Sequence, residues 1–204
     1  MWQEFSELLF PRRCLACNAF GLSMCEMCKK ELQFSLRIRH LGNLPVYSSA
    51  SFTPVARKLL LSAKEDGIKA ADRLIIDALK FAVSQGLPRH SIALQPIPSQ
   101  KDRIRQRGRS FVSELTKDLC NQKVTQVDLL GYCRKVRDQS TLSAQERSTN
   151  LSHAFSVSAK KFPISEEIFL VDDLVTTGAT LTEANRALTL AGFVVAGAIT
   201  AFSA

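Results

Sequence analysis

The chain has 204 residues, of which 46% are apolar and 23% charged. This composition supports a packed core and excludes extended disorder, and the length suits one ordinary domain with a small appendage. Lys and Arg exceed Asp and Glu by 27 − 19 = 8, which favours phosphate-bearing partners but is also compatible with ordinary solubilising charge.

No apolar stretch is long enough to cross a bilayer, because the longest candidate, residues 193–202, is interrupted by Gly197 and suits a final buried strand. The chain starts with the residues M-W-Q-E-F-S-E-L-L-F, which include acids and lack the basic region of a signal peptide. We therefore expect a cytoplasmic protein without a membrane span. The apolar spacing between Trp2 and Leu9 predicts a short helix there.

Two C-x-x-C pairs follow, formed by Cys14 with Cys17 and by Cys25 with Cys28. Four thiolates at this spacing suit one tetrahedral Zn²⁺, and a segment this short needs a metal to hold its shape. The alternatives are two disulfides, an iron–sulfur cluster or unliganded thiols. A cytoplasmic setting argues against disulfides, so we favour structural zinc.

Alternating strand and helix patterns fill the next part of the chain. Residues 29–45 are expected to be a connector, and 46–52 a strand. Helices are expected at 55–63 and 68–84, and residues 91–97 suit a buried strand that ends in Q-P-I-P-S.

A basic run comes next, with arginines at every second position: Arg103, Arg105, Arg107 and Arg109. Extended backbone would aim these guanidinium groups to one side, whereas a helix would spread them. The run is either a solvated loop or a mobile arm that meets pyrophosphate or a nucleic-acid backbone. A second basic cluster spans residues 134–137.

Shorter elements are expected between the basic run and the last third of the chain. The pattern predicts a helix over 111–121, a strand around 129–132 and a short apolar segment at 154–157. Ser143 and Glu146 have the spacing of a capping box, so a helical piece should begin there.

The most informative stretch begins with four apolar residues, Ile168 to Val171, which suit a strand buried on both faces. Asp172 and Asp173 follow at its carboxyl end, where open α/β sheets bind ligands. The next residues are T-T-G-A-T, and Thr180 with Glu183 has capping-box spacing. A helix is therefore predicted from Thr180 to about Ala191.

Loop amides at the positive end of this helix would form an anion site, and the adjacent carboxylates could accept hydrogen bonds from vicinal hydroxyls. The combination suits a sugar phosphate. The order of strands and helices predicts an α/β fold with a mostly parallel twisted sheet flanked by helices. We expect an N-terminal zinc module over 1–45 and the α/β domain over 46–204.

The joined motif resembles the phosphoribosyl-pyrophosphate-binding motif of type I phosphoribosyltransferases. With the cysteine pairs, the P-I-P turn, the Arg-Gly of the basic run and Q-S-x-L-S-x-x-E-R-x-x-N over 139–150, the whole chain resembles the bacterial ComF family. The family's usual R-G-F-N-Q and K-Y-x-G patterns are altered here, at residues 107–111 and 64–67.

The resemblance implies a type I phosphoribosyltransferase core, with Asp172 and Asp173 as the catalytic acids that bind the ribose hydroxyls. It assigns the 5-phosphate to a loop and the pyrophosphate to the turn at Pro98 and Ser99. The loop residues are Thr176, Thr177, Gly178, Ala179 and Thr180. Arg103 to Arg109 would form the flexible basic arm.

By the same resemblance, Mg²⁺ would neutralise the leaving pyrophosphate, and the protein would act in DNA uptake or use of external DNA with a competence helicase as partner. Catalysis would rest on positioning and electrostatics. The alternative is a non-catalytic accessory that senses nucleotides or binds single-stranded DNA. Neither the acceptor nor turnover follows from the residues.

Overall fold

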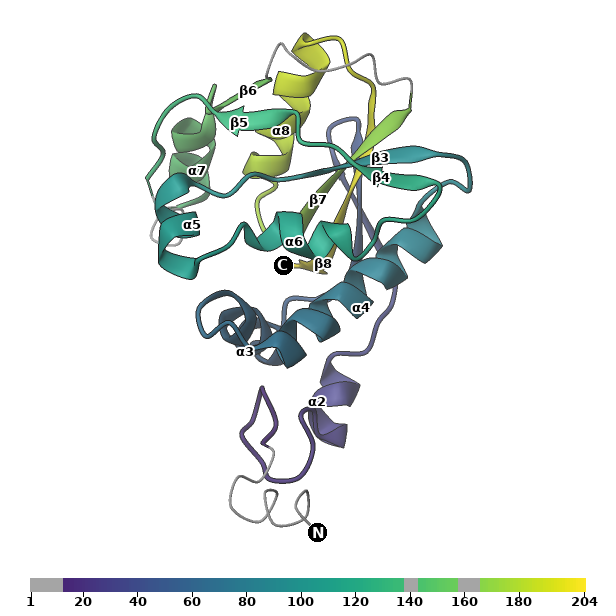
Figure 1. Ribbon diagram of the computed structural model, residues 1–204, viewed down its shortest axis with the longest axis vertical. Helices are drawn as coiled ribbons and strands as arrows, with labels where there is room; N and C mark the ends of the chain where they lie inside the picture. Colours follow the sequence, from purple (N-terminus) through teal and green to yellow (C-terminus); the bar gives the residue numbers. More distant parts are fainter. Residues whose placement is uncertain (1–12, 138–142, 158–165) are drawn as a thin grey trace.

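The computed structural model describes residues 13–137, 143–157 and 166–204 (Figure 1). The helix predicted near Trp2 and part of the motif over 139–150 lie outside these residues. Within them the helices are α2 (Glu26–Glu31), α3 (Pro54–Lys64), α4 (Lys69–Gly86), α5 (Lys101–Arg107), α6 (Phe111–Lys117), α7 (Ala144–Leu151) and α8 (Ala179–Leu190).

Six strands form the main sheet in the order β1-β2-β8-β7-β3-β4. Their bounds are β1 (Arg37–Leu41), β2 (Leu44–Ser51), β3 (Ile92–Pro96), β4 (Val124–Gln126), β7 (Glu167–Val175) and β8 (Val195–Ser203). Only β1 pairs in an antiparallel manner, and the four other pairings are parallel. A separate antiparallel pair joins β5 (Leu130–Tyr132) to β6 (Phe155–Val157).

Helices cover both faces of the sheet, and each face has its own buried cluster. On one face α4 packs against β2 and β8 while α6 packs against β3 and β7, burying Leu59, Leu79 and Phe111 among others. On the other face α8 packs against β7 and β8 over Leu170 and Leu181. The predicted fold class, a mostly parallel sheet flanked by helices with a small N-terminal cysteine module, is confirmed.

The cysteine module lies at one end of the elongated molecule, next to α3 and α4 and away from the sheet (Figure 1). The division at residue 45 stays a prediction. The expectation of a connector over 29–45 was wrong, however, because residues 37–41 form β1 and pair with β2. This strand lies at the edge of the sheet, and four of its five residues are exposed, so it lacks the apolar run of a buried strand.

Local rules account for most of the confirmed helices. Thr53 caps α3 by accepting a hydrogen bond from the amide of Ala56, and Pro54 begins the helix. The Ser143–Glu146 capping box is confirmed, because the Ser143 amide donates to the Glu146 carboxylate at 2.8 Å and the Glu146 amide donates to the Ser143 hydroxyl at 3.3 Å.

The second capping box was wrong. Helix α8 begins at Ala179, one residue early, because Gly178 takes the cap position at φ +82°, which costs least for a residue without a Cβ. Glu183 instead pairs with Arg186 at 2.6 Å and accepts from the amide of Phe155. This ties α8 to β6, a tertiary role that spacing along the chain does not reveal.

Two other boundaries differ from expectation. The helix expected over 111–121 ends at Lys117, and its tail is a turn that leads into β4, a strand the sequence pattern did not show. Strand β7 continues past the two acids to Val175, because β8 extends beside it and pairs Val175 with Ser203. No described helix is long and apolar enough to cross a membrane.

Candidate functional site

The acid pair lies in the carboxyl-terminal half of β7, near the centre of the sheet. Asp173 is only 4% exposed, and its carboxylate oxygen Oδ2 lies 2.7 Å from Nζ of Lys64, the last residue of α3. A buried carboxylate remains charged only if a cation or hydrogen-bond donors compensate it. Lys64 supplies such a cation to the buried Asp173 carboxylate.

Asp172 has different surroundings. Its carboxylate accepts a hydrogen bond from the backbone amide of Asp173 at 2.9 Å. Burial and then the charge of Asp173 raise the pKa of Asp172 well above its ordinary value, whereas Lys64 acts in the opposite direction. Burial and then the charge of Asp172 raise the pKa of Tyr132 on β5, so that phenol stays neutral.

The threonine loop leads from β7 directly into α8. The hydroxyl of Thr177 accepts from the amide of Ala179 at 3.3 Å, and Thr180 lies half-buried in the first turn of the helix. The loop and helix start offer backbone N–H groups and a partial positive charge to an anion. The strand–loop–helix context predicted for the motif is therefore present, with the acids on one side of the loop and the helix start on the other.

The β1–β2 hairpin reaches this loop. Arg39 Nη1 donates to the carbonyl oxygen of Thr176 at 2.5 Å. Leu41 packs directly against Gly178, so a Cβ on Gly178 would overlap the Leu41 methyl groups unless that side chain moved. Gly178 is thus required by its left-handed backbone and by this contact together.

The turn at Pro98 and Ser99 lies beside the acids. Strand β3 pairs with β7, and the amide of Ile97 donates to the carbonyl of Val171 at 2.8 Å, one residue before Asp172. Both turn residues are half-buried. The structure thus brings the predicted pyrophosphate turn and the acid pair to the same edge of the sheet.

The basic run forms a helix, α5, so its arginines spread over different directions. Arg107 pairs with Glu65 at 2.7 Å and is 15% exposed. Arg109 makes a bidentate pair with Asp72 at 2.7 and 2.8 Å and also donates to the carbonyl of Ala63 at 2.6 Å. These two contacts hold the end of the run against α3 and α4.

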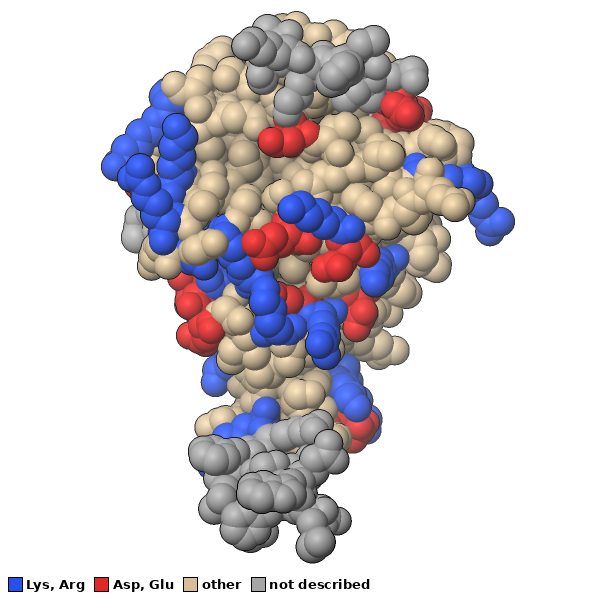
Figure 2. All heavy atoms as spheres, in the orientation of Figure 1, with Lys and Arg blue, Asp and Glu red and all other residues tan. Residues whose placement is uncertain are grey.

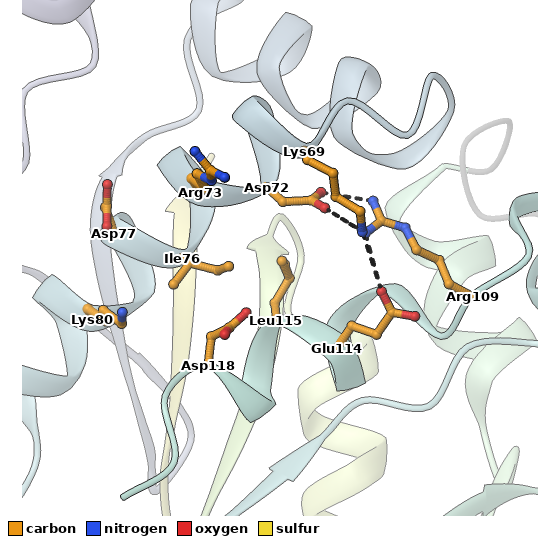
Figure 3. A pocket seen from close by; sticks show the side chains of 10 residues that line it. All are labelled: Lys69, Asp72, Arg73, Ile76, Asp77, Lys80, Arg109, Glu114, Leu115 and Asp118. Atoms are coloured by element: carbon orange, nitrogen blue, oxygen red, sulfur yellow. Dashed lines mark hydrogen bonds and ion pairs between the residues drawn. The ribbon is translucent and has the colours of Figure 1, made fainter.

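Arg109 also borders a hollow of about 460 Å³ between α4 and α6 (Figure 3). Charged side chains of both signs line it, including Lys69, Arg73 and Asp77. No other predicted site residue is among its lining residues. The hollow is therefore distinct from the acid pair and the threonine loop.

The two basic clusters of the sequence come together in space. Lys135 Nζ lies 3.3 Å from a carboxylate oxygen of Asp102 in α5, and Arg105 lies 3.9 Å from the same carboxylate. Both cations are more than 80% exposed, at 84% and 81%. Figure 2 shows the resulting group of Lys and Arg side chains on the left of the view, over α5.

The four cysteines form a compact cluster, with all sulfur atoms within 4.8 Å of one another and Cys17 3.5 Å from Cys25. A tetrahedral Zn²⁺ with Zn–S bonds of about 2.3 Å needs sulfurs about 3.8 Å apart. Burial raises the pKa of Cys14, but the backbone amides of Cys17, Cys25 and Ala16 together lower it to about 6. The arrangement is compatible with a structural zinc ion.

Three residues beside the predicted site were missed from the sequence. Lys64 was noted only as the start of the altered K-Y-x-G pattern, with no role at the acids, and Tyr132 gave no motif signal. Both reach the acids only through the packing of α3 and β5. Arg39 lies in the stretch expected to be a connector. The polar–apolar–polar run of Arg37, Ile38 and Arg39 is the one signal that could have placed it on a strand.

Taken together, these residues define a class: an α/β protein whose acids, threonine loop and neighbouring turn lie at the carboxyl edge of a parallel sheet, where such folds bind ligands. The chain is similar to "Competence protein F" of Haemophilus influenzae, being 32% identical over 126 residues. The predicted resemblance to the ComF family is thereby confirmed. The match covers 57% of this chain and 54% of that protein, so the chain spans about half the length of the curated relative.

No family model matches the chain. Similar solved structures include adenine phosphoribosyltransferase from Saccharomyces cerevisiae, 14% identical with a TM-score of 0.44, covering 88% of this chain and 90% of that one. Orotate phosphoribosyltransferase from Aeropyrum pernix is 19% identical with a TM-score of 0.40, covering 86% and 78%.

Proposed function

We propose that this protein binds phosphoribosyl pyrophosphate with Mg²⁺ and acts, as a phosphoribosyltransferase-like protein, in DNA uptake or use of external DNA. The observation that carries the proposal is the junction of three parts at one sheet edge: the acids of β7, the loop at Thr176 to Thr180, and the turn at Pro98 and Ser99, which is tied to β7 by the Ile97–Val171 hydrogen bond.

Each part suits one portion of the ligand. A carboxylate accepts hydrogen bonds from the vicinal ribose hydroxyls, and loop amides at the start of α8 donate to the 5-phosphate. The turn at Ser99 would hold the pyrophosphate. Mg²⁺ bound by the pyrophosphate oxygens would offset the charge that develops when they leave. The acceptor of the phosphoribosyl group is left open.

The test is calorimetric titration of the purified protein with phosphoribosyl pyrophosphate and Mg²⁺. We expect Asp172→Asn to weaken binding by about tenfold or more, because an amide accepts hydroxyl protons less well than a carboxylate. Asp77→Asn is the matched control, since Asp77 is an exposed acid on α4. An acceptor screen that follows pyrophosphate release then tests turnover. Equal affinity of Asp172→Asn and the wild-type protein would overturn the assignment.

A second candidate is binding of single-stranded DNA, with the competence helicase as a neighbouring partner and without turnover. The contact between Lys135 and Asp102 favours it, because it joins both basic clusters into one exposed surface. Phosphate contacts of this kind weaken steeply as salt rises. We expect Lys101→Ala, Arg105→Ala and Lys135→Ala together to flatten the salt dependence of binding to a labelled oligothymidylate.

Lys117→Ala, on α6, is the control for this surface. Binding that does not change with salt, or that is unchanged in the triple variant, would remove DNA from consideration and leave a nucleotide-sensing role as the non-catalytic alternative. The two candidate functions are compatible, since the exposed cations Arg105 and Lys135 belong neither to the acid pair nor to the threonine loop.

A further inference from the structure

The ion pair between Lys64 and Asp173 lies within the protein. The Lys64 side chain is 26% exposed and the Asp173 side chain 5%, with 2.7 Å between Nζ and Oδ2. Taking two charges out of water is costly, and apolar side chains of similar volume commonly give equal or greater stability. Fold stability alone therefore gives little reason for this pair.

Contacts of Lys64 with Phe111, and contacts of its two neighbours with arginines, hold the Lys64 side chain in place. Its ammonium group lies 5.5 Å from the centre of the Phe111 ring, and Arg109 lies 4.9 Å from the same ring. The residues on either side of Lys64 are also held: the carbonyl of Ala63 accepts from Arg109, and Glu65 pairs with Arg107. The end of α3 thus presents Lys64 to Asp173 in one orientation.

We propose that Lys64 is a positioning residue for a ribose-hydroxyl site: it holds the carboxyl group of Asp173 in the ion pair and leaves Asp172 as the acid that meets the vicinal hydroxyls of the ligand. This inference rests on the proposed function. It assigns unequal roles to two acids that the motif presents as equivalent, and it adds a residue from α3 to a site built from β7 and α8.

The charges around the pair support this division. The groups that face the acids are Lys64 from α3 and Tyr132 from β5, while Arg109 lies behind the Phe111 ring. Two neighbouring carboxyl groups without a cation tend to share one proton. Lys64 opposes the rise in the pKa of Asp172 that burial and Asp173 cause. Without Lys64, one proton would stay on the two acids up to a higher pH. One carboxylate that could accept a hydrogen bond from the ribose would then be lost.

The experiment compares Lys64→Met with Lys64→Arg and with Lys58→Met, an exposed lysine on the same helix. Phosphoribosyl pyrophosphate with Mg²⁺ is the probe, titrated calorimetrically between about pH 6 and pH 9. We expect Lys64→Met to bind about tenfold more weakly near neutral pH and to recover as the pH rises. Lys64→Arg and Lys58→Met should follow the wild-type protein.

A second variant separates positioning from direct ligand contact and covers the case in which Lys64→Met does not fold. Adding Asp173→Asn to Lys64→Met removes the orphaned charge, so the double variant should fold and bind more tightly than Lys64→Met at neutral pH. Where Lys64→Met is not folded, the double variant is compared with the wild-type protein and should stay within about tenfold of its affinity.

Each remaining outcome has one meaning. If Lys64→Met loses the same affinity at every pH, the positioning role is overturned. It is also overturned if the double variant binds no more tightly than a folded Lys64→Met, or more than about tenfold more weakly than the wild-type protein where Lys64→Met is not folded. Wild-type binding with unchanged affinity in Lys64→Met overturns this inference alone. Absence of binding by the wild-type protein overturns the proposed function and this inference with it.

Discussion

The stability of an Arg109→Met variant tests whether the end of the basic run is a mobile surface segment or is held to α3 and α4 by Arg109. The Arg109 side chain is 10% exposed and makes two hydrogen bonds to Asp72, whose own side chain is 7% exposed. Met fills much of the same volume but leaves Lys69, at 3.3 Å and 70% exposed, as the one cation paired with the Asp72 carboxylate among the described residues. Figure 3 shows this group from the side of the hollow.

The magnitude follows from the cost of leaving a buried charge without its partner, which is about 3 to 5 kcal/mol. Because Lys69 compensates part of the charge, we expect a loss near the lower limit, about 3 kcal/mol of unfolding free energy. For a chain of this size that corresponds to a fall in Tm of about 6 to 12 °C. An exposed arm residue would cost less than about 0.5 kcal/mol.

Urea unfolding followed by circular dichroism measures the difference, with Arg105→Met as the matched control. Arg105 is 81% exposed, and its contact with Asp102 is 3.9 Å long. Asp72→Asn in the Arg109→Met background should restore more than half of the loss, since it removes the orphaned charge. If Arg109→Met is as stable as Arg105→Met, the buried ion pair of Arg109 with Asp72 does not stabilise the fold.

Four further predictions concern other parts of the molecule. Removing metal from the reduced protein with a chelator should unfold the cysteine module and release about one zinc per chain by elemental analysis; an intact module without zinc would contradict this. Gly178→Ala should cost about 1 to 3 kcal/mol in urea unfolding, more than Gly42→Ala, because both have positive φ but only Gly178 has Leu41 against it. Because the pKa of Asp172 is raised, its contribution to stability is greatest at low pH and falls as the pH rises above about 4. The unfolding free energy of Asp172→Asn, measured against wild type in urea, should therefore rise over that range; a difference that does not change with pH would refute the raised pKa. Arg39→Ala should weaken binding of ribose 5-phosphate about fivefold and leave pyrophosphate binding unchanged, because Arg39 reaches the loop but not the turn; equal losses for both ligands would point to a general fold defect.

Local rules predicted the parts of the site that are continuous in the sequence. The strand before Asp172 is uniformly apolar because it is buried on both faces, and Gly178 marks the turn into α8. These signals depend only on neighbours along the chain, which is why the strand, loop and helix occur where expected.

The remaining parts depend on contacts between distant segments. Glu183 has the spacing of a cap residue, but Arg186 and β6 compete for its carboxylate and determine its role. Lys64 reaches Asp173 only because α3 ends beside β7. Arg109 looks like any other member of an arginine run until Asp72 is brought to it by α4. Sequence spacing carries no information on such pairs.

Strand β1 is an end strand of the main sheet, and most of its residues are exposed. It carries Arg37 and Arg39, so a second strand of the same sequence aligned there would bring cations face to face. We expect these charges to disfavour self-association through strand addition at this edge of the sheet.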